Sequence, residues 1–93
     1  MVVGVIAWEL EVFGCQSLKE KRSVVRSLKE RLRNRFNVSV AETGANDLWQ
    51  RAEITACVVS TDRRQADSVL ESVDRFVGSD PRARVIRTDR SIL

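Results

Sequence analysis

Five basic side chains recur in the sequence at alternating spacings of three and four residues. They are Lys19, Arg22, Arg26, Lys29 and Arg33. On an α-helix, which turns about 100° per residue, these positions fall in one wedge about 80° wide, and no acidic residue lies in it. Cations in such a row repel one another, and a polyanion such as RNA would relieve that repulsion. The alternative is a solvated helix face, because basic surface helices are common and most bind nothing.

The charge of the chain is concentrated in the same stretch. The 93 residues carry a formal net charge of +3. Residues 19–35 hold eight basic and two acidic side chains, so the rest of the chain has a net charge of −3. This segregation predicts one strongly basic surface rather than a uniformly basic protein.

The beginning of this stretch has its own pattern. Ser17-Leu18-Lys19-Glu20 forms a capping box, which marks a helix N-terminus. Free amides there, with Lys19, Lys21 and Arg22 nearby, could hold a phosphate, unless the cap already uses those amides. Lys21 falls on the apolar side of the helix, so either its stem runs past the core edge or its ammonium serves a site. We include Lys21 in the predicted nucleic-acid-binding set.

The segment from Thr43 to Arg51 is the second candidate for binding. It joins two predicted strands that should pair, and it is longer than the usual hairpin loop of about 2–5 residues. Trp49 could stack on a nucleobase, or it could fold back and cover the end of a small core. The sequence leaves both alternatives open, and Trp49 completes the predicted nucleic-acid-binding set.

The chain has few candidate catalytic residues. Histidine and tyrosine are absent, which removes the commonest general base and metal ligand. Glu9 and Glu11 would lie about 7 Å apart on one strand face, where they could assist hydrolysis or hold a cation, but a solvated face is commoner. Cys15 and Cys57 are far apart and, without histidine, make no zinc site. We expect a non-enzymatic protein with no catalytic residues, no metal and no cofactor.

Periodic patterns predict six elements. They are a strand at 2–12, a helix from the Ser17 cap to about Arg35, a strand at 36–41, a strand at 54–59, a helix after Asp62 and a strand at 83–88. The second helix has apolar positions at 66, 69, 70, 73, 76 and 77. Gly78 and Pro81 indicate where it ends.

The order βαββαβ predicts a single α+β domain, residues 1–93, with a ferredoxin-like fold. Right-handed crossovers place both helices on one face of a four-stranded antiparallel sheet. The first and third strands should be central, and the second and fourth should be the edges. If the apolar side chains at even positions face the helices, six others form an open apolar patch that suggests self-association. These predicted interface residues are Val3, Val5, Ala7, Thr55, Cys57 and Val59.

The chain has no run approaching the ~18 apolar residues of a membrane span. Its apolar start lacks the basic region of a signal peptide and is followed by Glu9 and Glu11. Together with the cysteine usage, this predicts a cytoplasmic protein without a membrane partner.

Several stretches resemble the YlxP-like family of small, functionally uncharacterised bacterial proteins. They are residues 1–5, residues 17–22, Phe36-Asn37-Val38-Ser39-Val40-Ala41-Glu42 and Asp47-Leu48-Trp49-Gln50. The resemblance implies a ferredoxin-like fold. It also associates the chain with RNA or the ribosome, because genes of this family often lie near genes for transcription elongation, translation initiation and ribosome maturation factors. It supplies no binding residues.

Two hypotheses follow from the sequence. In the first, the chain is an RNA- or ribosome-associated binding module that holds anionic backbone on the basic face of its first helix. In the second, it is a protein-interaction module or homodimer that uses the open sheet face and binds no nucleic acid. Salt-sensitive retention on RNA would separate them.

Overall fold

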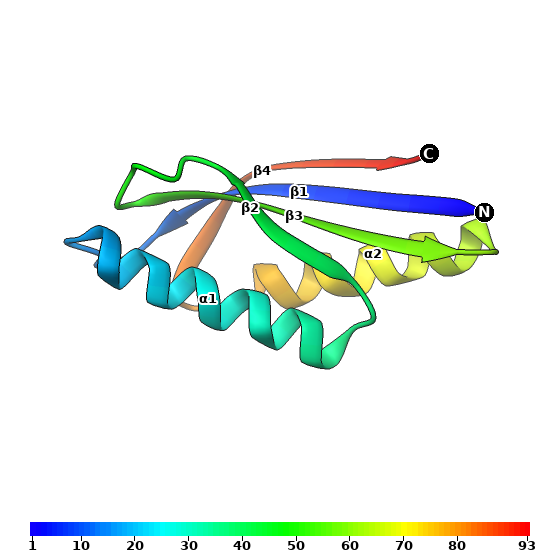
Figure 1. Ribbon diagram of the computed structural model, residues 1–93, viewed down its shortest axis with the longest axis horizontal. Helices are drawn as coiled ribbons and strands as arrows, with labels where there is room; N and C mark the ends of the chain where they lie inside the picture. The colour runs from blue at the N-terminus through cyan, green and yellow to red at the C-terminus, as the bar shows by residue number, and fades with distance from the viewer.

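The computed structural model describes all 93 residues and has the expected order of elements. The bounds are β1 Val2–Val12, α1 Leu18–Arg35, β2 Ser39–Gly44, β3 Arg51–Ser60, α2 Arg63–Gly78 and β4 Ala83–Ile92. The strands form one antiparallel sheet in the order β2-β3-β1-β4. Both helices lie beneath the sheet, and its other face is uncovered (Figure 1). This is the ferredoxin-like arrangement, with β1 and β3 central.

The core lies between the sheet and the helices because the two central strands alternate strictly. Even-numbered side chains of β1 and β3, such as Ile6, Trp8 and Ile54, are completely buried against the helices. Seventeen buried apolar side chains form a single cluster. The buried indole of Trp8 donates its Nε1 hydrogen to Asp74 Oδ1 of α2 at 2.9 Å, which satisfies its polar group. The predicted parity of both strands is therefore confirmed.

Close packing of α2 against the sheet depends on Gly4. A Cβ at this position would come within 3.0 Å of Val58 Cγ1 and 3.1 Å of Leu70 Cδ1. Since β1 and α2 meet here without a side chain between them, a larger residue would push the helix away from the sheet.

The ends of the helices follow local capping rules. Ser17 Oγ accepts a hydrogen bond from the Glu20 amide at 3.2 Å, and Glu20 Oε2 accepts from the amide of Gln16 at 2.7 Å. Asp62 caps α2 by accepting from the Arg64 amide. Gly78 is the last residue of α2 and Ser79 is the C-cap, so this glycine does not occupy the left-handed position expected beyond a helix.

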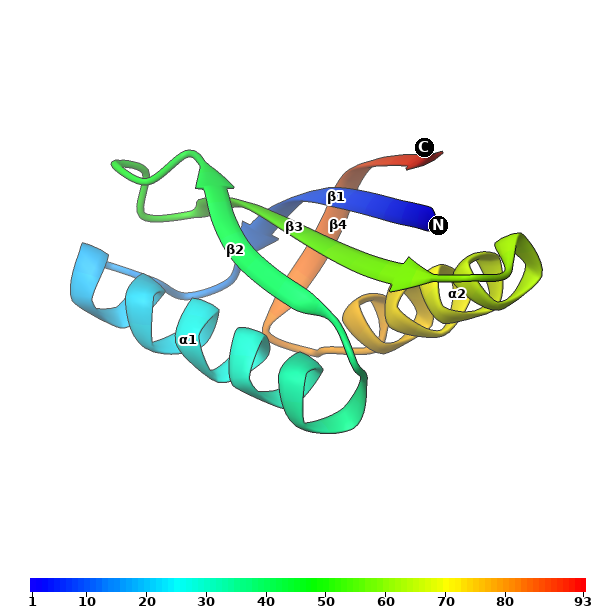
Figure 2. The ribbon, with the colours of Figure 1, turned by 45° about the vertical axis from the view of Figure 1, so that its right-hand side comes forward.

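The edge strands differ most from the sequence prediction. Strand β2 begins at Ser39 rather than residue 36, because the amide of Phe36 still bonds to Leu32 and its ring packs edge to face on Phe76. Strand β4 extends beyond residue 88 to Ile92, since its polar second half pairs with the start of β1. The register shifts between Glu9 and Leu10, where Ile86 of β4 is left without a partner in β1. Figure 2 shows β2 crossing in front of the sheet while β4 diverges behind it.

Candidate nucleic-acid interface

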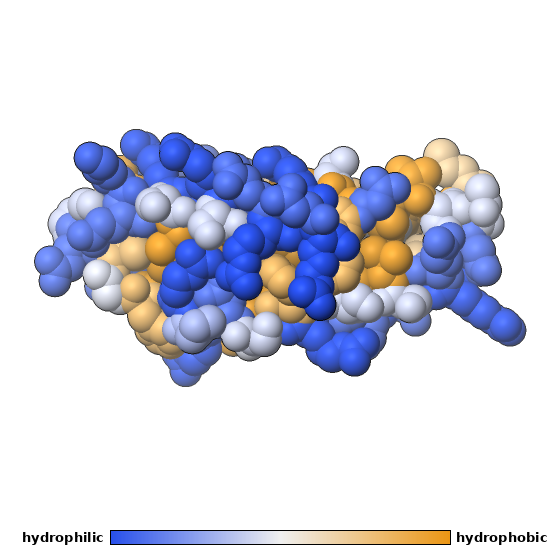
Figure 3. Space-filling view, turned by 90° about the horizontal axis from the view of Figure 1, so that it is seen from below, coloured by the Kyte–Doolittle hydropathy of each residue, from blue (hydrophilic) through white to orange (hydrophobic).

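The five periodic cations lie on the flank of α1 that faces β2. We call Lys19, Arg22, Arg26, Lys29 and Arg33 the basic ridge. Four of them are exposed and Lys29 is partly exposed. None of the five takes part in an ion pair. Seen from the helical side, hydrophilic side chains cover most of the surface, with apolar patches between them (Figure 3).

One ridge residue has a structural partner. Arg33 Nη2 donates to the carbonyl oxygen of Val40 at 2.6 Å. This carbonyl belongs to β2, which is an edge of the sheet. A cation on an outward carbonyl discourages pairing with another strand. The same contact places the C-terminal part of the ridge directly beside the β2 edge.

The opposite flank of α1 faces α2 and forms a groove with it. The groove is lined by Arg31, Arg35, Phe36, Ser72, Arg75, Phe76 and Ser79. The guanidinium carbons of Arg31 and Arg35 lie 5.1 and 5.5 Å from the centroid of the Phe76 ring, within cation–π range. By helical position, Glu20 and Glu30 lie on the exposed crest between this groove and the basic ridge. The basic residues of α1 are therefore divided between two separate surfaces.

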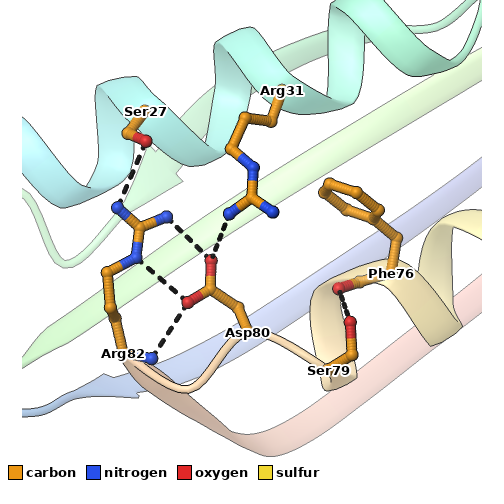
Figure 4. Close-up of polar contacts among 6 residues, drawn as sticks. All are labelled: Ser27, Arg31, Phe76, Ser79, Asp80 and Arg82. Atoms are coloured by element: carbon orange, nitrogen blue, oxygen red, sulfur yellow. Dashed lines mark hydrogen bonds and ion pairs between the residues drawn. The ribbon is translucent and has the colours of Figure 1, made fainter.

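A buried carboxylate organises the inner end of the groove (Figure 4). Asp80 is 6% exposed and accepts from the amide, Nε and Nη2 of Arg82 at 2.8–3.0 Å. Arg31 Nη1 lies 3.4 Å from Asp80 Oδ2, and Arg82 Nη1 donates to Ser27 Oγ of α1. Hydrogen bonds from Arg82 hold the pKa of Asp80 below its usual value, while burial opposes this shift. This network ties the α2–β4 connection to α1.

Lys21 is buried and cannot reach a ligand, which corrects the sequence prediction for this residue. Its side chain is 1% exposed. Its ammonium lies 3.1 Å from Glu42 Oε2 and also donates to the carbonyl oxygen of Ala45. Lys21 falls on the core side of α1, where the nearby edge strand supplies a carboxylate. Its function is to attach the β2–β3 hairpin to the first turns of α1.

Trp49 does not cover the core. Its side chain and that of Leu48 are each 53% exposed in the β2–β3 loop. Asp47, Leu48, Trp49, Gln50 and Arg51 line an open hollow around it. Of the two alternatives that the sequence left open, the structure contradicts the folded-back position and keeps the indole accessible to a ligand.

The open sheet face has an apolar half and a charged half. All six predicted interface residues lie in the apolar half, where Val3 pairs with Val59, Val5 with Cys57 and Ala7 with Thr55. The face is most apolar near the chain ends, where Val59 is 68% exposed and Leu93 is 77% exposed. Both ends of the chain lie on this side of the molecule (Figure 1).

The charged half of that face contains the carboxylates considered for catalysis. Glu9 Oε1 lies 3.2 Å from Arg51 Nη1, and Glu11 Oε1 lies 3.1 Å from Arg84 Nη2. Each carboxylate is thus paired with its own arginine, which is the pattern of a solvated strand face. No three acidic or cysteine side chains gather where they could hold a metal ion.

The sequence patterns did not predict two features of the surface. The network around Asp80 joins α1 to the distant α2–β4 connection, and no local spacing indicates it. Phe13, at the end of β1, is 51% exposed although it continues an apolar strand. Its odd position, on the same parity as Glu9 and Glu11, was the available signal that it faces away from the core.

Both cysteines are free, Cys15 buried and Cys57 partly exposed. Burial, with a smaller contribution from Glu20, raises the pKa of the Cys15 thiol. Neither helix combines the length and apolar character needed to cross a membrane.

Comparison with known proteins gives a consistent family but no activity. The family described as "Protein of unknown function (DUF503)" matches residues 3–90. The uncharacterized protein YlxP of Bacillus subtilis (strain 168) is 38% identical over 80 residues, which cover 86% of this chain and 87% of YlxP. A de novo designed protein with a ferredoxin fold, solved in solution by NMR, aligns with 99% of this chain and 84% of its own at 15% identity and a TM-score of 0.42.

Proposed function

We propose that this chain, which belongs to the DUF503 family of proteins of unknown function, is a non-enzymatic module that binds RNA along the basic ridge of α1. The RNA is either free or part of the ribosome. The ribosomal alternative rests on the resemblance to the YlxP-like family described above.

One observation carries this proposal: the ridge cations have no acidic partner in the fold. The arginines of β4, together with Arg31, Arg51 and Arg82, lie in ion pairs with an aspartate or glutamate. Outside the ridge, Arg35, Arg63, Arg64 and Arg75 also lack such a partner, but they do not form a continuous row on one helix. The ridge has no such partner, and its members repel one another at spacings of three and four residues. Phosphates would supply the missing counter-charge.

The dimensions of the ridge suit a nucleic-acid backbone. From Lys19 to Arg33 it extends about 21 Å at about 1.5 Å per residue. Several phosphates of one strand can meet it at the same time. Contacts of this kind carry no base-specific hydrogen bonds, so binding should depend steeply on salt and weakly on sequence.

The salt dependence of RNA affinity tests the proposal. Each phosphate contact contributes about 0.7–0.9 to the slope of log affinity against log salt concentration. Replacing Arg22, Arg26 and Lys29 with glutamine should flatten that slope by about two units or more. Glutamine has a good helix propensity, so α1 should remain folded.

The groove offers a matched control. Replacing Arg31, Arg35 and Arg75 with glutamine removes the same formal charge from the α2 side of the helical face. We expect this second triple variant to keep the wild-type slope. If both triple variants flatten the slope equally, RNA binding depends on the net charge of the protein and not on the ridge. If the ridge variant binds RNA like wild type at every salt concentration, the ridge is a solvated face.

The apolar half of the open sheet face favours a second candidate function, self-association. Val59 and Leu93 expose most of their side chains there, and Val3 and Val5 lie beside them. A second copy of the chain would cover this patch, and RNA binding on the other side of the sheet does not compete with it. The substitutions Val5→Lys and Val59→Lys should leave the fold intact and abolish association in analytical ultracentrifugation. A wild-type protein that stays monomeric at high concentration would contradict this candidate.

A further inference from the structure

We infer that the RNA is single-stranded where it reaches the β2–β3 loop, and that Phe13 and Trp49 together stack on one unpaired base there. This inference rests on the proposed function and adds the class of RNA to it. It also adds Phe13, which no sequence pattern assigned to the ligand.

The register of the two central strands brings the backbones of Phe13 and Trp49 to the same place. Strand β1 pairs with β3 so that Glu11 lies opposite Arg51. The amide of Val12 then donates to the carbonyl oxygen of Gln50 at 2.8 Å, which continues the same register. Phe13 follows Val12 in the chain and Trp49 precedes Gln50, so the backbones of both aromatic residues lie next to this bonded pair, just beyond the ends of β1 and β3.

Both rings are available to a ligand. Phe13 is 51% exposed and Trp49 is 53% exposed, whereas Trp8 is completely buried. Both residues lie just beyond the ends of β1 and β3, next to the charged half of the open sheet face. The strands themselves place no aromatic side chain on that face, so this end is the one part of it where a base could stack.

The aromatic pair is close to the beginning of the ridge. Lys21, in the first turns of α1, donates to the carbonyl oxygen of Ala45 in the loop. Lys19 and Arg22 are its neighbours along the helix and belong to the ridge. The hairpin loop and the start of α1 lie at the same end of the molecule (Figure 1). A strand whose phosphates follow the ridge therefore reaches the rings at its end.

The chemistry of the loop favours a base over a phosphate at this point. Asp47 and Arg51 both line the hollow beside Leu48 and Trp49, but Arg51 is already paired with Glu9. The charge of Asp47 therefore disfavours phosphate, while the apolar surfaces attract a base. In an RNA duplex the bases are already stacked within the helix, and their faces are not accessible to protein rings. An unpaired base offers a free face to an aromatic ring.

Tryptophan fluorescence provides a direct test. The chain has two tryptophans, and Trp8 is shielded in the core, so quenching by a ligand reports Trp49. We would titrate the protein with an oligoadenylate strand of about 12 nucleotides and with a blunt RNA duplex of the same length. The strand should quench the exposed tryptophan and bind more tightly. The duplex should bind through the ridge without quenching.

Substitutions locate the base. Phe13→Leu and Trp49→Leu should each weaken binding of the strand about 5- to 150-fold, the range expected for loss of one base–aromatic stack. Neither should change the affinity for the duplex or the salt slope. Ile86→Ala removes an exposed apolar side chain of β4 and should leave the affinities for strand and duplex unchanged. Emission of Trp8 in the Trp49→Leu variant confirms that the core is intact.

The possible outcomes separate this inference from the proposed function. If strand and duplex bind equally, with normal salt slopes and no effect of either substitution, the base-stacking inference is wrong and the ridge proposal stands. If neither RNA binds at any salt concentration, both are wrong. If only Trp49→Leu weakens the strand, the pairing with Phe13 is wrong.

Discussion

The two flanks of α1 carry the same kind of side chain in opposite circumstances. On the flank facing α2, Arg31 lies 3.4 Å from the Asp80 carboxylate, and Arg31 and Arg35 pack over the ring of Phe76. On the flank facing β2, the ridge has no carboxylate partner, and its single recorded contact is that of Arg33 with a backbone carbonyl. Lys21 lies between these flanks, on the core side, and is paired with Glu42.

This difference separates cations that stabilise the fold from cations that make little contribution to its stability. Arg31 and Arg35 lie over an aromatic ring, and Arg31 also pairs with a buried carboxylate. Arg35 and Arg75 lie in the last turns of the two helices, as Arg33 of the ridge does, where positive charge is favourable to the helix dipole. Most of the ridge makes no comparable contribution. The ridge is therefore the surface where we propose a ligand, whereas Arg31 and Arg35 of the groove already have partners within the fold.

Lys21 should give the largest effect on stability, because its removal leaves the largely buried Glu42 carboxylate without its counter-charge. We expect Lys21→Met to lower the free energy of unfolding by about 2–3 kcal/mol, since Glu42 keeps only limited access to water. Urea unfolding measures this change. The double variant Lys21→Met, Glu42→Gln should recover much of the loss. If the single variant is as stable as wild type, the pair does not hold the hairpin.

Asp80 should give the next largest effect. Replacing it with alanine removes the hydrogen bonds from Arg82 and the ion pair with Arg31. We expect the free energy of unfolding to fall by about 2 kcal/mol, with the salt slope of RNA binding unchanged. If Asp80→Ala instead flattens the salt slope and keeps the wild-type stability, the groove flank binds RNA and does not stabilise the fold.

The pH dependence of stability provides an independent check on Asp80. Its pKa is lowered in the folded state, mainly by the hydrogen bonds from Arg82. Its contribution is therefore complete above the unfolded-state pKa of about 3.9 and is lost as the pH falls toward the lower folded-state value. Acid titration of wild type and Asp80→Asn should show a difference in stability at neutral pH that shrinks below about pH 4.

A matched pair of single substitutions should give the smallest effect and the sharpest contrast. Arg35→Gln removes a cation–π contact and a charge at the helix C-terminus, so we expect a loss of about 1 kcal/mol. Arg26→Gln relieves repulsion within the ridge and should change stability by less than about 0.5 kcal/mol. In RNA binding the order reverses, since only Arg26→Gln should flatten the salt slope, by about 0.7–0.9. Equal effects of both substitutions in either measurement would remove the distinction between the flanks.

Much of the fold follows from local patterns. The alternation of β1 and β3 predicts which side chains face the helices, because successive residues of a strand point to opposite faces. Ser17 and Glu20 predict the start of α1, since capping involves residues only a few positions apart. The spacing of the five cations likewise places them on one side of a helix. Each of these features depends on neighbours in the sequence.

The edges and the partners of charged residues depend on distant parts of the chain. The sequence pattern ends β4 near residue 88, and pairing with β1 extends it to Ile92. Lys21 and Arg22 are adjacent and equally basic in sequence, yet only Lys21 meets Glu42, twenty-one residues away. Arg31 meets Asp80, forty-nine residues away. The sequence shows that a side chain carries charge. Whether that charge is already neutralised depends on which segments folding brings against it, because electrostatic interactions act through space at distances of a few ångströms.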